Sequence, residues 1–311
     1  MFLYILRRIG LAIPLVLAVI IITFTLGHYA PTDPVRLLIP QDVNPDQATI
    51  DRLRHQYGLD KPFLVQLRDY LTNLAHGNFG SSIALNRPVG SALAHALPIS
   101  MQLGLAALVL IIIVGIPLGV ITALKQNTWL DYTILFGTIT LSTIPPFVLA
   151  PLLMILLILK LHILPSTTGW SGIFSVKAIL PVVTLAVGPL LGVVRYTRFS
   201  VIEVLGQDYV RTARAKGLPM RAIIFRHILP NALTPVVTSL GLTVAGLITG
   251  SIFLENIFGI PGFGQLAVNS ITGNDYQVIL GTTIVGALLV IGSNLIVDVL
   301  YGLLDPRVRL Q

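Results

Sequence analysis

Six long apolar runs constrain the fold of this 311-residue chain more than any other feature. Each run is close to the ~20 residues that an α-helix needs to cross about 30 Å of hydrocarbon. Backbone groups in lipid must be paired within their own segment, and no run alternates like a barrel strand, so helices are expected. The sequence therefore predicts an all-α polytopic membrane protein with six transmembrane helices. The runs are Ile9 to Gly27, Ile99 to Leu124, Tyr132 to Leu159, Ile179 to Ile202, Leu233 to Leu254, and Val278 to Leu300.

Composition excludes several classes of function. Charged residues make up only 11% of the chain, against about a quarter in soluble domains. The chain has no cysteine, which excludes disulfides, thiol catalysis and thiolate metal sites. The six histidines lack the paired spacings of metal sites, and neither a Gly-Lys pair nor a nucleophile elbow is present. The sequence thus predicts no catalytic residue, no metal site and no directly bound cofactor.

The distribution of Lys and Arg predicts the orientation in the membrane. With the N-terminus inside, the inner segments hold twelve basic and four acidic residues, whereas the outer segments hold eight of each. The positive-inside rule then places both termini in the cytoplasm, and the basic charge gives no reason to expect a nucleic-acid partner. The first run, preceded by Arg7 and Arg8, is longer than the apolar core of a signal peptide, so it is interpreted as an uncleaved anchor.

Four segments follow along the chain. Residues 1–30 form a cytoplasmic segment and the first transmembrane helix, and residues 31–97 form an extracytoplasmic insertion. Residues 98–302 form a five-helix core with a cytoplasmic island at 203–230, and residues 303–311 form a cytoplasmic tail. Within the insertion, helices are expected over Asp46 to Tyr57 and Pro62 to Leu74. A small capping domain is the favoured interpretation, with a mobile loop that has no role as the alternative.

The polar island at 203–230 is basic and lies between two apolar runs. Gly217 suits a left-handed C-terminal position and Pro219 suits the first turn of a helix, so two short helices meeting at a bend are predicted. Small Ala213 would let another backbone approach an exposed helix face. That face consists of Tyr209, Thr212, Ala213 and Lys216. The alternative is that the basic residues only set topology and contact anionic headgroups.

Polar residues within the apolar runs are few. Asp298 is the only acidic residue in a run, and we expect it to pair with Arg195 or Arg198 rather than to act in transport. The adjacent Pro145 and Pro146 predict a kink or an unwound stretch, which could serve gating or only the packing shape.

The polar island resembles the "EAA" loop of ABC importer permeases. Gly217 is followed at a distance by Leu229-Pro230, and Ala213 stands four residues before the glycine. Arg211 and Thr212 depart from the general pattern, which has Glu and Ala, so no role of that Glu is carried over. The sequence from Asp208 to Leu218 is similar to that of the dipeptide and oligopeptide branch of the family, the DppB/OppB type. Further matches are Met1 to Pro14, Pro31 to Pro34, Gly58 to Pro62, Gly77 to Ser81, Arg87 to Val89, and Glu255 to Gly264.

The resemblance implies a type I ABC importer-like permease fold in the bacterial cytoplasmic membrane. It also implies a second, DppC/OppC-like permease, one or two cytoplasmic ATPase subunits that hold ATP and Mg, and an extracytoplasmic peptide-binding protein. Di- and oligopeptides are the implied substrates, although relatives carry nickel or glutathione. The implied ATPase-coupling residues are Tyr209, Arg211, Thr212, Ala213, Arg214, Ala215, Lys216, Gly217, Leu218 and Pro219.

The segment from Glu255 to Gly264 is predicted to lie outside, between the last two runs. Its glycines permit tight turns, and its large apolar side chains are unsuited to water. It either dips back beside the translocation path or forms a structural turn packed on helix ends. The candidate residues are Glu255, Asn256, Phe258, Gly259, Pro261, Gly262, Phe263 and Gly264.

Two other classes of function have less support in the sequence. An ion-coupled secondary transporter would need buried carboxylates or broken-helix ion sites, and Asp298 stands alone. A membrane enzyme would need a catalytic constellation, which is missing from the sequence.

Overall fold

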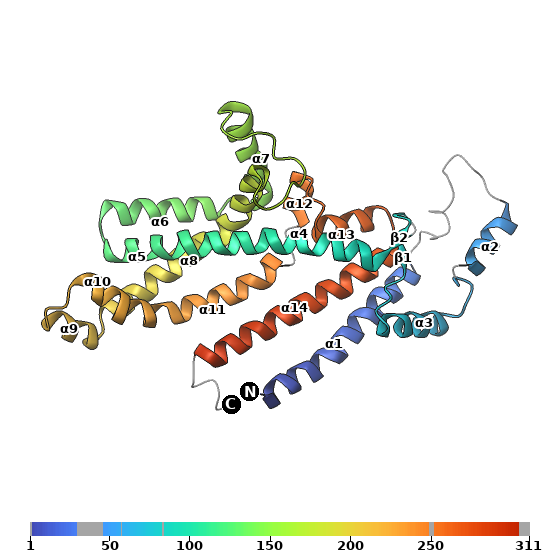
Figure 1. Cartoon of the computed structure of the whole chain (residues 1–311), viewed down its shortest axis with the longest axis horizontal. Helices are drawn as coiled ribbons and strands as arrows, with labels where there is room; N and C mark the ends of the chain where they lie inside the picture. Colours follow the sequence, from blue (N-terminus) through green and yellow to red (C-terminus); the bar gives the residue numbers. More distant parts are fainter. Residues whose placement is uncertain (1, 30–45, 57, 83, 249–251, 305–311) are drawn as a thin grey trace. The chain divides into compact units, whose positions relative to one another are not determined.

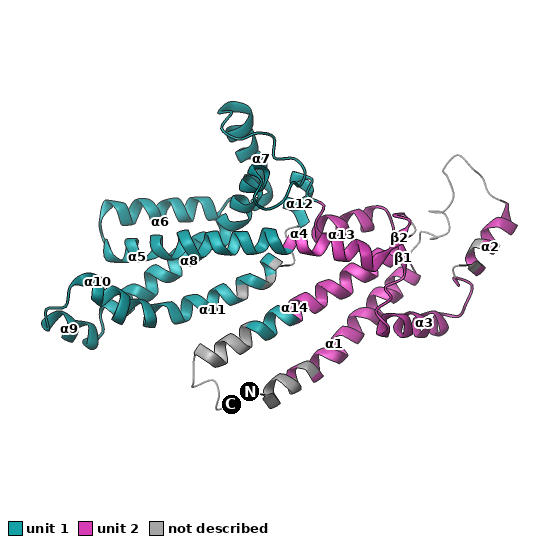
Figure 2. Ribbon diagram, in the orientation of Figure 1, with its two compact units in different colours: residues 1, 101–260, 292–311 teal, residues 2–100, 261–291 magenta. Residues whose placement is uncertain are grey.

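The computed structural model describes residues 2–29, 46–56, 58–82, 84–248 and 252–304. The predicted match at Pro31 to Pro34 and most of the predicted tail lie outside these residues. The chain divides into two compact units (Figure 2), and each is described by itself. Unit 1 contains residues 101–260 and 292–311, and unit 2 contains residues 2–100 and 261–291.

Four described helices are long and apolar enough to cross a membrane. They cover Gly10–His28, Val89–Leu124, Val176–Leu205 and Tyr276–Ile296. The helices Trp129–Ser142 and Pro146–Lys160 add a fifth span if they count as one, although they are bent by 103°. The described residues thus support four or five of the six predicted spans. The fifth predicted run lies mainly in helix α11 (Leu229–Ile248), and residues 249–251 of it are not described.

Proline explains the sharp bend in the third predicted run. Pro145 is extended, with a ψ of 141°, and Pro146 opens the next helix. A proline lacks the N–H that would continue the preceding helix, and the residue before a proline is driven out of the helical region. The predicted break at this pair is therefore confirmed.

Unit 1 is built around the 30-residue helix α8, which packs on α5, α6, α7 and α11. The Ser175 hydroxyl caps its start by accepting a hydrogen bond from the Lys177 N–H at 3.2 Å. Gly119 of α5 lets this helix approach closely, because a Cβ there would lie 2.7 Å from the Val194 carbonyl of α8. Unit 1 holds the C-terminal part of α4, η2 (Ile111–Gly115), α5 (Ile116–Leu124), α6 (Trp129–Ser142), α7 (Pro146–Met154), η3 (Ile155–Lys160), α8 (Val176–Leu205), α9 (Asp208–Ala215), α10 (Met220–Ile223), η4 (Ile224–Ile228), α11, α12 (Ile252–Phe258) and the C-terminal part of α14.

Unit 2 joins helices that are far apart in the sequence. Ile20, Tyr70, Leu280 and Ile284 form one buried cluster. Burial raises the pKa of Tyr70 to about 12. The elements are α1 (Phe2–His28), α2 (Gln47–Gln56), α3 (Phe63–Ala75), β1 (Ser81–Ser82), β2 (Arg87–Pro88), the N-terminal part of α4 (Val89–Leu110), α13 (Phe263–Thr272) and the N-terminal part of α14 (Tyr276–Leu304).

Helices α2 and α3 confirm the two helices predicted in the insertion. Helix α4, however, begins at Val89, so the predicted domain boundary at residue 97 falls inside a continuous helix. Val89 and Leu93 already lie in a buried cluster with Phe263 and Val278. The helix extends beyond the predicted apolar run because His95 and Pro98 interrupt the apolar pattern without interrupting the helix.

Candidate functional site

Two short helices, α9 and α10, form the first candidate site, at one end of α8 and α11 in unit 1 (Figure 1). Gly217 between them adopts a φ of +76°, which glycine reaches without strain, and Pro219 is the N-cap of α10. The helix then continues through η4 into α11. The predicted helix pair and its bend are confirmed.

One side of α9 is anchored in the unit's own core. Val210 is fully buried, and Ala213 is 5% exposed. Both join a cluster of buried residues that also holds Ala123 of α5, Val201 of α8, Ile223, Ile228 and Ala232. The prediction that Ala213 belongs to an exposed face is therefore wrong. Val210 and Ala213 form the apolar stripe of a polar helix, and this stripe packs on the chain's own spans, so the small side chain of Ala213 is not available to a partner.

The other side of the helix pair is exposed and mixes cations with apolar side chains. Tyr209, Leu218 and Met220 are 43%, 38% and 47% exposed. The ion pair on this surface is loose, with 3.6 Å between Arg211 Nη1 and Asp208 Oδ1. We call this exposed set the α9–α10 surface. It consists of Tyr209, Arg211, Thr212, Arg214, Ala215, Lys216, Gly217, Leu218, Pro219 and Met220.

A buried ion pair ties α6 to α8 in unit 1. The Arg198 guanidinium donates from Nε to Asp131 Oδ1 at 2.7 Å and from Nη2 to Oδ2 at 2.8 Å. Asp131 is fully buried and also accepts from the Asn127 N–H at 3.0 Å. Arg198 therefore has Asp131 as its partner, where we had expected Asp298. The Asp298 side chain lies outside the described part, so its pairing with Arg195 stays a prediction.

The segment predicted as an outer loop is divided between the two units. In unit 1, Glu255 and Phe258 are fully buried, and the Phe258 carbonyl accepts a hydrogen bond from the Gly169 N–H at 2.8 Å. Gly259 has a φ of +62°, whereas Asn256 is exposed and donates its amide to the Ile252 carbonyl.

In unit 2, the same segment caps α13 and packs on α4. The Phe263 N–H donates to Ser100 Oγ at 2.8 Å, and both Phe263 and Gly264 are buried. Pro261 and Gly262 line the pocket described next. These contacts are those of a turn packed on helices, one of the two predicted alternatives. A place beside a translocation path stays a prediction.

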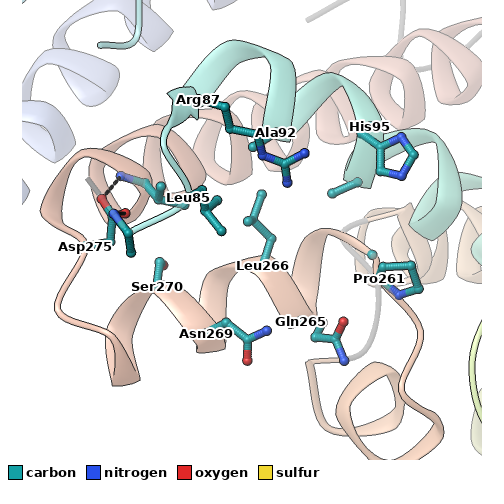
Figure 3. A pocket seen from close by; sticks show the side chains of 14 residues that line it. Leu85, Arg87, Ala92, His95, Pro261, Gln265, Leu266, Asn269, Ser270 and Asp275 are labelled. Atoms are coloured by element: carbon teal, nitrogen blue, oxygen red, sulfur yellow. Dashed lines mark hydrogen bonds between the residues drawn. The ribbon is translucent and has the colours of Figure 1, made fainter. Parts of the chain in front are cut away.

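A pocket in unit 2 is the second candidate site (Figure 3). It has a volume of about 180 Å³ and lies between α4, α13 and the segment that connects β1 to β2. Its apolar lining includes Ala92, Ala96, Leu266 and Val278, and Arg87, His95, Gln265 and Asn269 add polar groups. The sequence does not predict this pocket, because Arg87 stands out only as part of a motif match and the residues around the cavity are far apart along the chain.

The carboxylate of Asp275, at the edge of this pocket, accepts hydrogen bonds from neutral donors. Its Oδ2 accepts from the Ser82 hydroxyl at 2.5 Å and from the Ala84 N–H at 3.1 Å. Its Oδ1 faces the Val278 N–H at 3.4 Å. These bonds hold the turn between β1 and β2 against the start of α14 and satisfy a buried carboxylate without a cation.

The chain matches known transport proteins over almost its full length. A family described as "Binding-protein-dependent transport system inner membrane component" matches residues 115–310, and the N-terminal part of such components matches residues 1–104. The oligopeptide transport system permease protein OppB of Salmonella typhimurium (strain LT2) is 43% identical over 310 residues, which cover 98% of this chain and 99% of that protein. The dipeptide transport system permease protein DppB of Bacillus subtilis (strain 168) is 40% identical over 309 residues, which cover 99% of this chain and 98% of that protein.

A solved structure shares the fold. An inward-facing conformation of the MetNI methionine ABC transporter superposes with a TM-score of 0.58 and 18% sequence identity. The match covers 69% of this chain and 96% of that one. At this identity the likeness supports the architecture alone.

Proposed function

Because the chain belongs to the family of inner membrane components of binding-protein-dependent transport systems, we propose that it is a permease subunit of an ATP-driven peptide importer. With a second, homologous permease it would form the pathway for di- and oligopeptides across the bacterial cytoplasmic membrane. The names of the relatives, which are oligopeptide and dipeptide permeases, support the substrate class.

The energy for transport would come from partner subunits. The chain contains no Gly-Lys pair and hence no phosphate-binding loop of the Walker A type. Separate cytoplasmic ATPases would bind ATP and Mg and close around the nucleotide. A ligand can shift a conformational equilibrium only by contacting the two states differently, so the ATPases need a surface of the permease to hold.

The α9–α10 surface is the proposed contact, and the anchoring of α9 is the observation that carries this proposal. Exposed Tyr209, Leu218 and Met220 offer apolar area, surrounded by cations that fit an acidic cleft. On the opposite side, Val210 and Ala213 pack on residues of α5, α8 and α11. A displacement imposed on the exposed side would therefore be transmitted to the spans, since packed helices move as units.

The remaining parts of the assembly follow from the predicted orientation. The α9–α10 surface would face the cytoplasm, and both chain termini would lie on the same side. The segment predicted to be extracytoplasmic, residues 31–97, would face an extracytoplasmic binding protein that delivers the peptide. This binding protein would make most of the selection among peptides.

Leu218→Glu tests the contact, because it places a carboxylate on the exposed apolar part of the α9–α10 surface without disturbing the buried side. In the complete transporter we expect co-purified ATPase and peptide uptake to fall together by at least about tenfold, as for a charge placed in a contact core. The matched control is Gln126→Glu, which adds the same charge at an exposed loop position of unit 1 and should change neither.

Normal amounts of co-purified ATPase together with normal uptake in Leu218→Glu would overturn the proposed contact. The amount of each variant in the membrane must be measured as well. A loss of uptake that merely follows a loss of inserted protein would count against the contact too.

A further inference from the structure

We infer that the pocket of unit 2 binds the C-terminal residue of the peptide cargo, with Arg87 holding its carboxylate and the apolar lining holding its side chain. This inference rests on the proposed function and adds a point of contact between permease and peptide. It starts from three properties of the pocket, which are its charge, its lining and its rigidity.

The charge of the pocket is the first argument. Among the described residues that line it, Arg87 and Asp275 are the two that carry a full charge, and the Asp275 carboxylate already accepts from Ser82, Ala84 and Val278. No ion pair or hydrogen bond of the Arg87 side chain is found among the residues that the structure describes. Arg68 in the same unit, by contrast, pairs with Asp69. The pocket therefore presents an unpaired guanidinium, whose planar fork matches a carboxylate.

The lining identifies which carboxylate would fit. Ala92, Ala96 and Val278 are buried apolar residues, and Figure 3 shows the Leu266 and Arg87 side chains reaching toward the cavity from opposite sides. A C-terminal residue carries its carboxylate and its side chain on the same α-carbon, so it can occupy both features. An Asp or Glu of a docking protein has no apolar branch on the carbon that bears its carboxylate, so it would leave the exposed Leu85 side chain of the lining in water.

The volume of the pocket and its polar groups fit a single amino-acid residue of a peptide. A volume of about 180 Å³ is well below the ~300 Å³ at which pockets begin to hold drug-sized ligands. Asn269 lies one turn after Gln265 on α13, so both side chains line the pocket from the same helix face, and Asn269 is exposed there. His95 adds a ring nitrogen from the side of α4 (Figure 3).

The backbone that carries Arg87 is fixed before any ligand arrives. Arg87 lies on β2 and pairs with Ser82 of β1, whose hydroxyl also binds Asp275. Gly80, with a φ of +84°, accepts the Val89 N–H at 3.0 Å where the turn meets α4. With the backbone at Arg87 held in place, binding would order only the side chain, which favours affinity.

The test compares a peptide with its C-terminal amide in the complete transporter, reconstituted in proteoliposomes with the binding protein. Alanyl-leucine and alanyl-leucinamide are supplied at concentrations that saturate the binding protein with each. For the wild type we expect the free acid to be taken up about tenfold faster, the range of one charged hydrogen bond. For Arg87→Gln we expect this ratio to fall to about one through loss of uptake of the free acid alone.

Arg68→Gln is the matched control, since it removes an exposed arginine of the same unit and should keep the wild-type ratio. Arg87→Lys keeps the positive charge and should retain part of the preference for the free acid. A wild-type ratio in Arg87→Gln would overturn the inference. An equal loss of acid and amide uptake would also overturn it, and would assign Arg87 to the docking of an acidic surface of the binding protein.

A second measurement does not depend on transport. A dipeptide with a diazirine analogue of leucine at its C-terminus is irradiated with the purified complex, and the labelled residues are mapped by mass spectrometry. Label between residues 84 and 96 or between 261 and 278, reduced at least about fivefold in Arg87→Gln, supports the inference. Label elsewhere overturns it. If the wild-type complex imports no peptide although this labelling occurs, the proposed function fails separately.

Discussion

Each unit buries a carboxylate at the end of a helix, and the two are neutralised differently. In unit 1, Asp131 receives the whole guanidinium fork of Arg198. In unit 2, Asp275 receives a hydroxyl and backbone N–H groups. Both solutions satisfy a buried charge, but only the second leaves a neighbouring arginine available. We therefore regard Arg198 as a residue that holds α6 to α8, and Arg87 as a residue that is available to a ligand.

The comparison predicts its largest effect at Arg198. Arg198→Met leaves Asp131 buried without its cation, which costs about 3–5 kcal/mol in comparable buried pairs. We expect the variant to show a markedly lower unfolding temperature in detergent and a low yield in the membrane. Arg226→Met, at an exposed position of the same unit, should behave like the wild type.

A double variant shows whether the Arg198 effect comes from the stranded charge. Asp131→Leu combined with Arg198→Met removes both charges, and we expect it to recover most of the lost stability. If Arg198→Met unfolds at the wild-type temperature, or if the double variant is as unstable as the single one, the pair does not hold α6 to α8.

A smaller effect is expected at Ser82. Ser82→Ala removes one of the donors to Asp275 and the acceptor of the Leu85 N–H, so a loss of about 1.5–3 kcal/mol is expected. The unfolding temperature measures this loss, with exposed Ser81→Ala as the control. An unfolding temperature for Ser82→Ala equal to that of Ser81→Ala would show that Asp275 needs no hydroxyl.

The smallest effect on stability is expected at Arg87. Because its side chain is exposed and unpaired among the described residues, Arg87→Gln should change the free energy of unfolding by no more than about 0.5 kcal/mol. A loss as large as that of Ser82→Ala would mean that Arg87 has a structural role. The contrast between the two arginines would then disappear.

Local features of the fold could be predicted from the sequence because neighbouring residues cause them. The bend at Gly217 and Pro219 and the break at Pro145 follow from backbone chemistry. The helix that begins at Val89 extends ten residues before the predicted apolar run, because Val89 and Leu93 pack on Phe263 and Val278 although Ser91 and His95 interrupt the apolar pattern.

Features that depend on distant contacts could not be predicted. Helical spacing placed Ala213 on a face, but whether that face meets the chain's own spans or a partner is decided by tertiary packing. The predicted spans place both Arg198 and Asp298 near the inner side of the membrane. Arg198 instead binds Asp131, which lies 67 positions earlier in the chain. The pocket needs the turn before α4 to meet α13, a contact that no local motif indicates.

The most direct test of the proposed function is uptake of a labelled dipeptide into proteoliposomes that contain this chain, its second permease and its ATPases. ATP is supplied on the cytoplasmic side of the transporter and peptide-loaded binding protein on the opposite side. We predict that the dipeptide accumulates and that this accumulation stops when ATP is replaced by a non-hydrolysable analogue. Accumulation that persists without ATP hydrolysis and follows an imposed ion gradient would contradict the account and support an ion-coupled transporter instead.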